Sequence, residues 1–333
     1  MLMLKKTIAA LSLLSILAAC QNDENPSQPE PKPRQDINLT RAEQEFMDKG
    51  TDFAFRFFDQ VCSTEKEKPN VFVSPLSASL CLSMITNGAT DNTLAEMQDV
   101  LGFPANTFSL DDLNNYNQKL TSALLDLDNT TQLGIANSIW IEEGFKVYDS
   151  FVDVNKKMYD AQVQELDFTS PTAKDVINQW CATQTNNCIK EVIQEIPADA
   201  RMYLINALYF KGIWKSQFDK SATGQDNFTN VDGSQQKVAM MNQTATFNYT
   251  QTDDFSIAEL PYGNEAFSMV ILLPSGDKTL DESLPSLNYE NWKQWSKNMV
   301  GKELQIKLPR FKVEYDKELE EDMIAMGMKD AFD

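Results

Sequence analysis

The chain of 333 residues contains no histidine, and this narrows the chemistry that its side chains could carry. A serine or cysteine nucleophile of the triad type needs an imidazole that takes and returns a proton near neutral pH. Most catalytic zinc sites also include an imidazole ligand. The cysteines show no spacing typical of a metal site. We therefore expect neither a hydrolase centre nor a metal or other cofactor.

Cys20 is a candidate for covalent modification, because it ends an apolar N-terminal segment. Lys5 and Lys6 precede an apolar run over 7–17, which is followed by Leu-Ala-Ala-Cys20. The run is short for a membrane span and ends in small residues, as secretory signals do. The four residues up to Cys20 resemble the bacterial lipobox, which implies a signal peptide over 1–19 and a lipid anchor on Cys20. The alternative is an ordinary signal peptide with a chance cysteine.

A spacer follows the anchor residue. Gln21 stands where an aspartate would indicate retention at the inner membrane, so we expect the outer membrane or the cell surface. Residues 20–39 are polar and contain four prolines, which is typical of an extended, semi-rigid tether. We expect the folded domain over 40–333.

The net charge of −20, from 29 basic and 49 acidic residues, excludes general binding to nucleic acid. An acidic surface repels phosphate backbones, whereas it favours solubility and attracts basic partners.

Four cysteines remain in the expected domain, namely Cys62, Cys81, Cys181 and Cys188. Three pairings are possible in principle. Cys181 and Cys188 lie about two helical turns apart, which is too far for a bridge within one helix. We expect free thiols, with Cys81 in the core.

Apolar periodicity and capping residues predict an α+β domain with several sheets. Helices are expected over 40–61, 74–87, 93–101, 111–127, 148–159, from 171, over 289–299 and over 316–326. Strands are expected over 70–73, 131–141, 161–168, 201–210, 237–242, 246–250, 255–260, 267–273 and 302–313, the last with a bend at Pro309. The helix over 74–87 is apolar nearly all round and should be buried. The run over 201–210 should be a central strand covered on both faces.

Six segments in order resemble the serpin family. They are 70–80 (NVFVSPLSASL), 87–97 (NGATDNTLAEM), 136–141 (ANSIWI), 177–189 (INQW followed by TN and Ile189), 204–214 (LINALYFKGIW) and 308–332 (LPRFK followed by MGM and AF). The resemblance implies a serpin fold with about eight or nine helices and three β-sheets. It also implies that the strands bearing the reactive loop lie beyond Asp333, so that this chain is incomplete at its C-terminus.

The resemblance assigns roles to four side chains. Ser74, Ser77 and Asn206 match the "shutter", where strands part to admit the reactive loop, and Trp214 matches the "breach", where the loop first enters. An asparagine in an apolar strand and hydroxyls on a buried helix must find hydrogen-bond partners or cost about 1–3 kcal/mol each. The alternatives are that Ser74 only caps its helix, that Asn206 is a satisfied core amide and that Trp214 is an ordinary core residue.

Two functions compete on this basis. The first is suicide inhibition of serine or cysteine proteases by loop insertion, performed by a full-length monomer without turnover. The second is a non-inhibitory, serpin-like surface lipoprotein that acts as a binding scaffold. By this resemblance, the reactive bond that a protease would cleave has no counterpart in this chain. Because that bond sets the protease specificity, the sequence does not specify the target protease.

Overall fold

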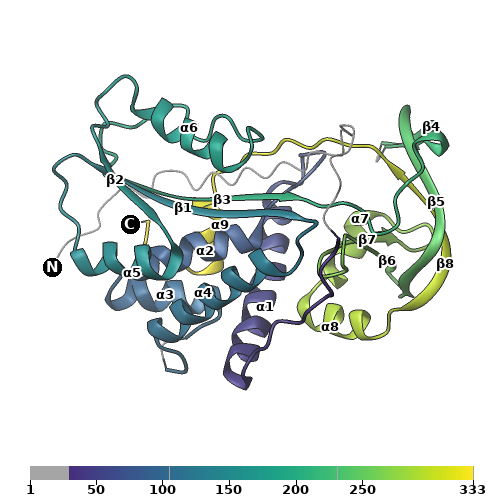
Figure 1. The fold of residues 1–333 in the computed structure, drawn as a ribbon, viewed down its shortest axis with the longest axis horizontal. Helices are drawn as coiled ribbons and strands as arrows, with labels where there is room; N and C mark the ends of the chain where they lie inside the picture. Colours follow the sequence, from purple (N-terminus) through teal and green to yellow (C-terminus); the bar gives the residue numbers. More distant parts are fainter. Residues whose placement is uncertain (1–29, 105, 231, 333) are drawn as a thin grey trace.

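The computed structural model describes residues 30–104, 106–230 and 232–332. The predicted signal peptide, Cys20 and the first part of the tether lie outside these residues. Within them, a three-stranded sheet is layered between helices, and a five-stranded sheet with two covering helices lies beside it (Figure 1).

Nine α-helices occur in the described part of the chain. They are α1 (Arg41–Thr64), α2 (Pro75–Thr86), α3 (Asp91–Leu101), α4 (Leu110–Asp126), α5 (Asp149–Tyr159), α6 (Ala173–Gln184), α7 (Leu280–Ser283), α8 (Tyr289–Lys297) and α9 (Glu320–Met326). None of these described helices is long and apolar enough to cross a membrane.

Eight strands form two sheets in the part of the chain that the structure describes. They are β1 (Gln132–Glu142), β2 (Gln162–Leu166), β3 (Met202–Lys211), β4 (Gly224–Thr229), β5 (Gln235–Gln251), β6 (Phe255–Pro261), β7 (Ser268–Pro274) and β8 (Val300–Pro309). The first sheet has the order β2-β1-β3, with β1 parallel to β2 and antiparallel to β3.

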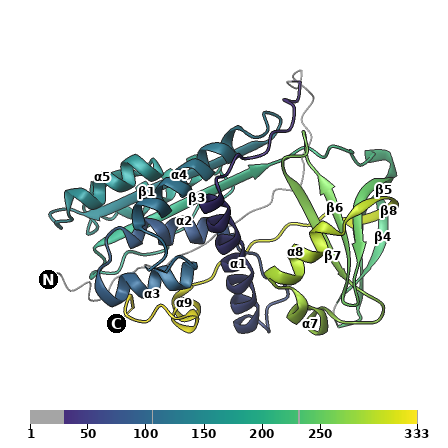
Figure 2. The same cartoon turned by 90° about the horizontal axis from the view of Figure 1, so that it is seen from below.

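The two faces of the three-stranded sheet are covered by different helices, α6 on one side and α2 on the other (Figure 1). On the α6 face, Trp140 packs edge to face against Trp180 with ring centroids 6.3 Å apart. On the α2 face, Ile139 packs with Leu80 and Met84. The opposite side of α2 packs in a second core with α1, α3, α4 and α9 (Figure 2). The prediction that this helix is buried on most sides is therefore confirmed.

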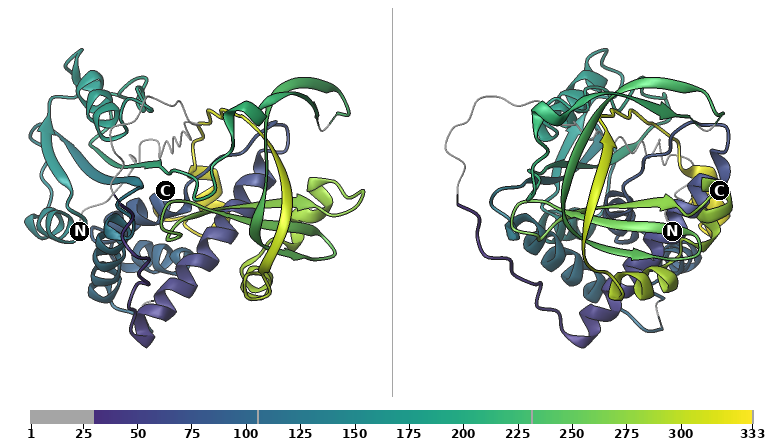
Figure 3. Two further views of the ribbon diagram at one scale, coloured as in Figure 1. Left: turned by 45° about the vertical axis from the view of Figure 1, so that its right-hand side comes forward. Right: turned by 90° about the vertical axis from the view of Figure 1, so that its right-hand side faces the viewer.

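The described residues form two sheets, whereas the resemblance implied three for the serpin fold. The sequence pattern suggested separate strands over 237–242 and 246–250, but β5 is continuous over 17 residues. Its first part pairs with β4, its last part with β6, and β8 runs along its middle from Met240 to Tyr249 (Figure 3). The polar residues between the two expected strands stay in the sheet because β8 satisfies their backbone groups.

Three further expectations need correction. Residues 70–73 form no strand, because Val71, Phe72 and Val73 pack against the helical core instead of pairing. β3 is covered on both faces, but among the described strands it lies at an edge and not at the centre. β8 ends at Pro309, where a bend within a longer strand was expected. A proline cannot donate to the ladder, and the chain after it continues without a regular partner strand.

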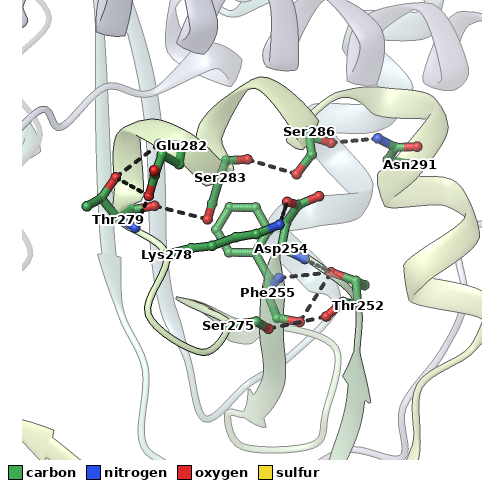
Figure 4. A network of polar contacts seen from close by, with 10 residues as sticks. All are labelled: Thr252, Asp254, Phe255, Ser275, Lys278, Thr279, Glu282, Ser283, Ser286 and Asn291. Carbon is green, nitrogen blue, oxygen red and sulfur yellow. Dashed lines mark hydrogen bonds and ion pairs between the residues drawn. The ribbon is translucent and has the colours of Figure 1, made fainter.

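Short polar contacts join α8 to the segment after α7, and join the start of this helical region to the five-stranded sheet (Figure 4). Lys278 Nζ lies 2.7 Å from Asp254 Oδ1, which joins the start of the helical segment to the turn before β6. Asn291 Nδ2 of α8 donates to the Ser286 carbonyl at 2.7 Å. Beneath them, Phe255 packs against Trp295 in a small core of its own.

The tether makes contacts where it reaches the described residues. The Lys32 backbone N–H donates to Asn129 Oδ1 at 2.8 Å, and Lys32 Nζ lies 2.6 Å from Asp126 Oδ1. Residues 30–39 contain no helix or strand. This part of the tether therefore lies against the loop between α4 and β1.

The start of α1 confirms the capping box predicted at Thr40. Thr40 Oγ1 accepts from the Glu43 N–H, and the Thr40 N–H donates back to Glu43 Oε2 at 2.7 Å. Lys119 Nζ of α4 lies 2.7 Å from the same carboxylate oxygen. The hydrogen bond from Lys119, with help from the Thr40 backbone, lowers the pKa of Glu43 from its usual value near 4.5 to about 2.

This pKa predicts a stability change in acid. A carboxyl group whose pKa is lower in the folded state stabilises the fold above its unfolded pKa, and that contribution is lost as the pH falls from about 4.5 to about 2. Glu43→Gln should therefore lower the free energy of unfolding at pH 7, and the difference from wild type should shrink through this pH window. Urea unfolding of both proteins at several pH values measures this difference in the free energy of unfolding. Glu45→Gln, at an exposed position of the same helix, is the matched control. A Glu43→Gln difference that stays constant with pH would refute the assignment.

Candidate functional site

Ser77 and Asn206 meet beneath the three-stranded sheet. Ser77 lies in the first turn of α2 and is 3% exposed. Its hydroxyl donates to the side-chain oxygen Oδ1 of Asn206, which projects from β3. The pairing register places Asn206 opposite Asn137 of β1, and Asn206 Nδ2 donates to Asn137 Oδ1 at 2.8 Å. An otherwise apolar interface between helix and sheet thus contains a satisfied polar contact.

Ser74 caps α2, which is one of the two roles that the sequence suggested for it. Its Oγ accepts from the Ser77 N–H at 3.3 Å, which makes it the N-cap of α2. No hydrogen bond from Ser74 to Asn206 is present in the described structure. Of the three predicted shutter side chains, two are in contact and the third holds the helix start that places Ser77.

Asn137 is not among the predicted site residues, although it lies in a segment that carried the resemblance. The available signal was a second asparagine in a second apolar strand. Only the register of β1 against β3 makes the two asparagines partners, and they are 69 residues apart in the sequence.

Cys81 lies one helical turn beyond Ser77 and faces the same strand. Its Sγ donates to the Leu204 carbonyl at 3.6 Å, and burial raises the pKa of this thiol to about 12. The four cysteines of the described domain are all free, as expected. Cys81 is thus an unreactive thiol in the closed structure, placed directly under β3.

Trp214 lies past the end of β3, where it stacks on Tyr262. The ring centroids are 4.3 Å apart and the planes 17° apart, and the two residues form an isolated antiparallel bridge. The Gly263 N–H donates to the Ile213 carbonyl at 2.8 Å. Trp214 is half-buried, so it is not an ordinary core tryptophan. It joins the end of β3 to the hairpin between β6 and β7.

Gly212 allows this stacking, because a Cβ at this position would lie 2.7 Å from the Tyr262 ring. Gly212→Ala should therefore push Tyr262 away from Trp214 and lower the free energy of unfolding by about 1–3 kcal/mol, as overpacking does. Denaturant unfolding gives the energy, and tryptophan fluorescence reports the lost stacking. Gly224→Ala is the control, since nothing lies within 4 Å of a Cβ there. Equal stability of the two variants would show that the ring contact is unimportant.

No group of three or more cysteine, aspartate and glutamate side chains in the described part of the chain is arranged to hold a metal ion. The described side chains in contact around Asn206 are amides and a hydroxyl, and none of them is a general base. The arrangement therefore supports hydrogen bonds between α2 and β3, which break if the two elements separate.

Comparisons with known proteins agree with this geometry. A family model described as "Serpin (serine protease inhibitor)" matches residues 48–333. Serpin B3 of Homo sapiens is 31% identical over 302 residues, which are 85% of this chain and 77% of that protein. An uncharacterized serpin-like protein of Methanosarcina acetivorans is 33% identical over 287 residues, and the match spans 84% of this chain and 66% of that relative.

Solved structures show the same fold. The thermophilic serpin tengpin in its latent state superposes with a TM-score of 0.79 at 31% identity, covering 89% of this chain and 78% of that one. Ovalbumin from emu (Dromaius novaehollandiae) gives a TM-score of 0.80 at 25% identity over 85% of this chain and 78% of that one. With the fold, the polar contact under β3 and the match over residues 48–333 taken together, the chain belongs to the serpin family.

Proposed function

We propose that the full-length product inhibits serine or cysteine proteases by inserting a cleaved reactive loop beside β3. The observation that carries this proposal is the Ser77–Asn206 contact, a polar link between α2 and the strand β3. β3 pairs with β1 along one edge, and no strand pairs with its other edge among the residues described. A new strand at that edge would gain main-chain hydrogen bonds, which is how extended segments join sheets. The family description, serine protease inhibitor, agrees with the proposal.

The reaction begins with the protease and not with this chain. The nucleophile of the protease attacks the carbonyl of the scissile bond, an acyl bond to the enzyme forms, and the peptide bond breaks with a proton going to the leaving amine. The inserting loop then carries the acylated enzyme along the sheet before water can release it. The driving force is the added strand, held back until cleavage in a kinetically trapped state. We place the reactive loop beyond Asp333 in the full-length product.

The test is incubation of the purified full-length product with trypsin-like, elastase-like and papain-like proteases. We expect a covalent complex with at least one of them that survives denaturing gel electrophoresis. The control is the same protease with its nucleophile blocked, which should give no complex. Cleavage of the product by every protease without any complex would overturn the proposal and favour a non-inhibitory scaffold.

We also propose that Cys20 carries a lipid that anchors the protein at the outer membrane or cell surface, with the Pro-rich segment as spacer. The support is the Leu-Ala-Ala-Cys20 segment after a short apolar run. Cys20→Ser should move the protein from the membrane fraction to the soluble fraction. Cys62→Ser, which changes a thiol of the folded domain, should leave it in the membrane fraction. Retention of the Cys20→Ser variant on the membrane would contradict the anchor.

A further inference from the structure

The polar contact at Asn206 continues into the helices below the sheet. Asn137, which accepts from Asn206, donates in turn through Nδ2 to the Tyr159 carbonyl at 2.7 Å. Tyr159 is the last residue of α5. Asn137 and Tyr159 are 5% and 6% exposed, so water does not replace these bonds. A chain of hydrogen bonds therefore runs from α2 through β3 and β1 to the end of α5.

The direction of this chain is fixed at one end. A backbone carbonyl only accepts hydrogen bonds, so Asn137 must present its NH₂ to Tyr159 and its oxygen to Asn206. Asn206 must then present its own NH₂ to Asn137 and its oxygen to Ser77. The orientation in which Asn206 receives the Ser77 hydroxyl is thus set by Tyr159, two side chains away.

The ring of Tyr159 is itself held in place by hydrogen bonds between its hydroxyl group and α4. Its hydroxyl donates to Asn114 Oδ1 at 2.6 Å and accepts from Asn117 Nδ2 at 3.2 Å, and both asparagines belong to α4. They are 2% and 4% exposed. Asn114 is joined to Asn87, at the end of α2, by two reciprocal amide bonds of 2.8 and 3.1 Å. Burial raises the pKa of Tyr159 to about 12, so the hydroxyl keeps its proton and remains a donor.

We propose that Tyr159 and Asn137 are positioning residues for the separation of β3 from α2. Through the fixed direction of the hydrogen-bond chain, they hold Asn206 in the orientation that keeps the sheet closed. This inference rests on the proposed function for its purpose, since the opening of β3 is the step that admits a new strand. The rate of opening itself is a property of this chain and is measurable without any protease.

The test is hydrogen exchange of the purified full-length product, read by peptide mapping, on wild type and Tyr159→Phe. The variant keeps the ring and removes only the hydroxyl, so we expect it to fold. Exchange should rise roughly five-fold, the factor for one lost buried hydrogen bond, in peptides covering β3 and β1. Peptides covering β6 and β7 should not change. Labelling of Cys81 by a thiol reagent should accelerate by the same factor, because that thiol lies under β3.

Two further variants sharpen the result. Asn137→Asp has nearly the same shape but places a carboxylate oxygen against the Tyr159 carbonyl, so its effect on β3 should exceed that of Tyr159→Phe. Tyr249→Phe, on β5, removes a hydroxyl with only long contacts of 3.3 and 3.4 Å and is the matched control. It should leave exchange in β3 unchanged.

Two outcomes would overturn the inference. The first is an equal rise in exchange in every protected segment of Tyr159→Phe, which would mean ordinary loss of stability. The second is no rise in β3. If exchange changes as expected while the wild type traps no protease, the proposed function fails and the positioning role of Tyr159 stands. If the wild type traps a protease while exchange in β3 does not change, the positioning role fails alone.

Discussion

Lys317→Met is expected to lower the free energy of unfolding by about 3–5 kcal/mol, the usual cost of removing one member of a buried ion pair. Lys317 Nζ lies 3.0 Å from Glu65 Oε1 and 3.3 Å from Asp322 Oδ2. The side chains of Lys317 and Glu65 are 14% exposed, and that of Asp322 is 1% exposed. Without the ammonium group, two neighbouring carboxylates would remain in a largely water-free site.

The surroundings of Asp322 show that this cluster joins distant parts of the chain. Asp322 Oδ1 accepts from Thr64 Oγ1 at 2.9 Å and from Gln60 Nε2 at 3.3 Å. The cluster thus fastens α9 to the end of α1. Although burial acts in the opposite direction, the hydrogen bonds to Glu65 and Asp322 raise the pKa of Lys317, which keeps it charged.

Denaturant unfolding of matched variants measures this cost. Lys312→Met removes a lysine of the same segment whose ion pair with Glu314 is 68% and 64% exposed, and it should cost less than about 1 kcal/mol. Adding Glu65→Gln to Lys317→Met should recover part of the loss, because one unpaired charge is removed. Lys317→Met and Lys312→Met with equal stability would show that the cluster contributes nothing.

The second large effect is expected at Asn206. Asn206→Leu nearly conserves the volume of the side chain but removes the donor to Asn137 and the oxygen that accepts from Ser77. Asn137 is 5% exposed and Ser77 is 3% exposed, so water does not replace the lost partner. Each polar group left unpaired should cost about 1–3 kcal/mol of the free energy of unfolding.

The control for Asn206 is Asn248→Leu. Asn248 is exposed on β5 and donates to Glu259 Oε2 at the surface. This variant should stay within about 0.5 kcal/mol of wild type. An Asn206→Leu protein as stable as Asn248→Leu would mean that the amide under the sheet is not required for the folded state.

Helix starts were predictable because their chemistry is local. Thr40 with Glu43, and Ser74 before Pro75, satisfy the free N–H groups of the first turn within a few residues. The same locality explains why Ser74 acts as a cap. Its oxygen accepts from the backbone N–H of Ser77, three residues away.

Strand partners were harder to predict, since pairing is decided by distant residues. The run over 70–73 has strand composition, but it pairs with none of the described strands, and the helical core covers it. The asparagine pair across β1 and β3 and the contact of Tyr159 with α4 depend on register and packing between segments 42 to 69 residues apart. A single sequence records the residue types in these contacts but not which of them face each other.

The uninterrupted course of β5 has a mechanical consequence for the molecule. β4 and β6 hold opposite ends of one strand while β8 binds its middle, so none of the three pairs that include β5 can separate without loosening the strand that they share. Local unfolding usually proceeds in cooperative units. The β4–β8 region should therefore come apart as a single unit under force or heat. β3 shares no strand with that unit and is linked to it through the Trp214–Tyr262 contact past its end.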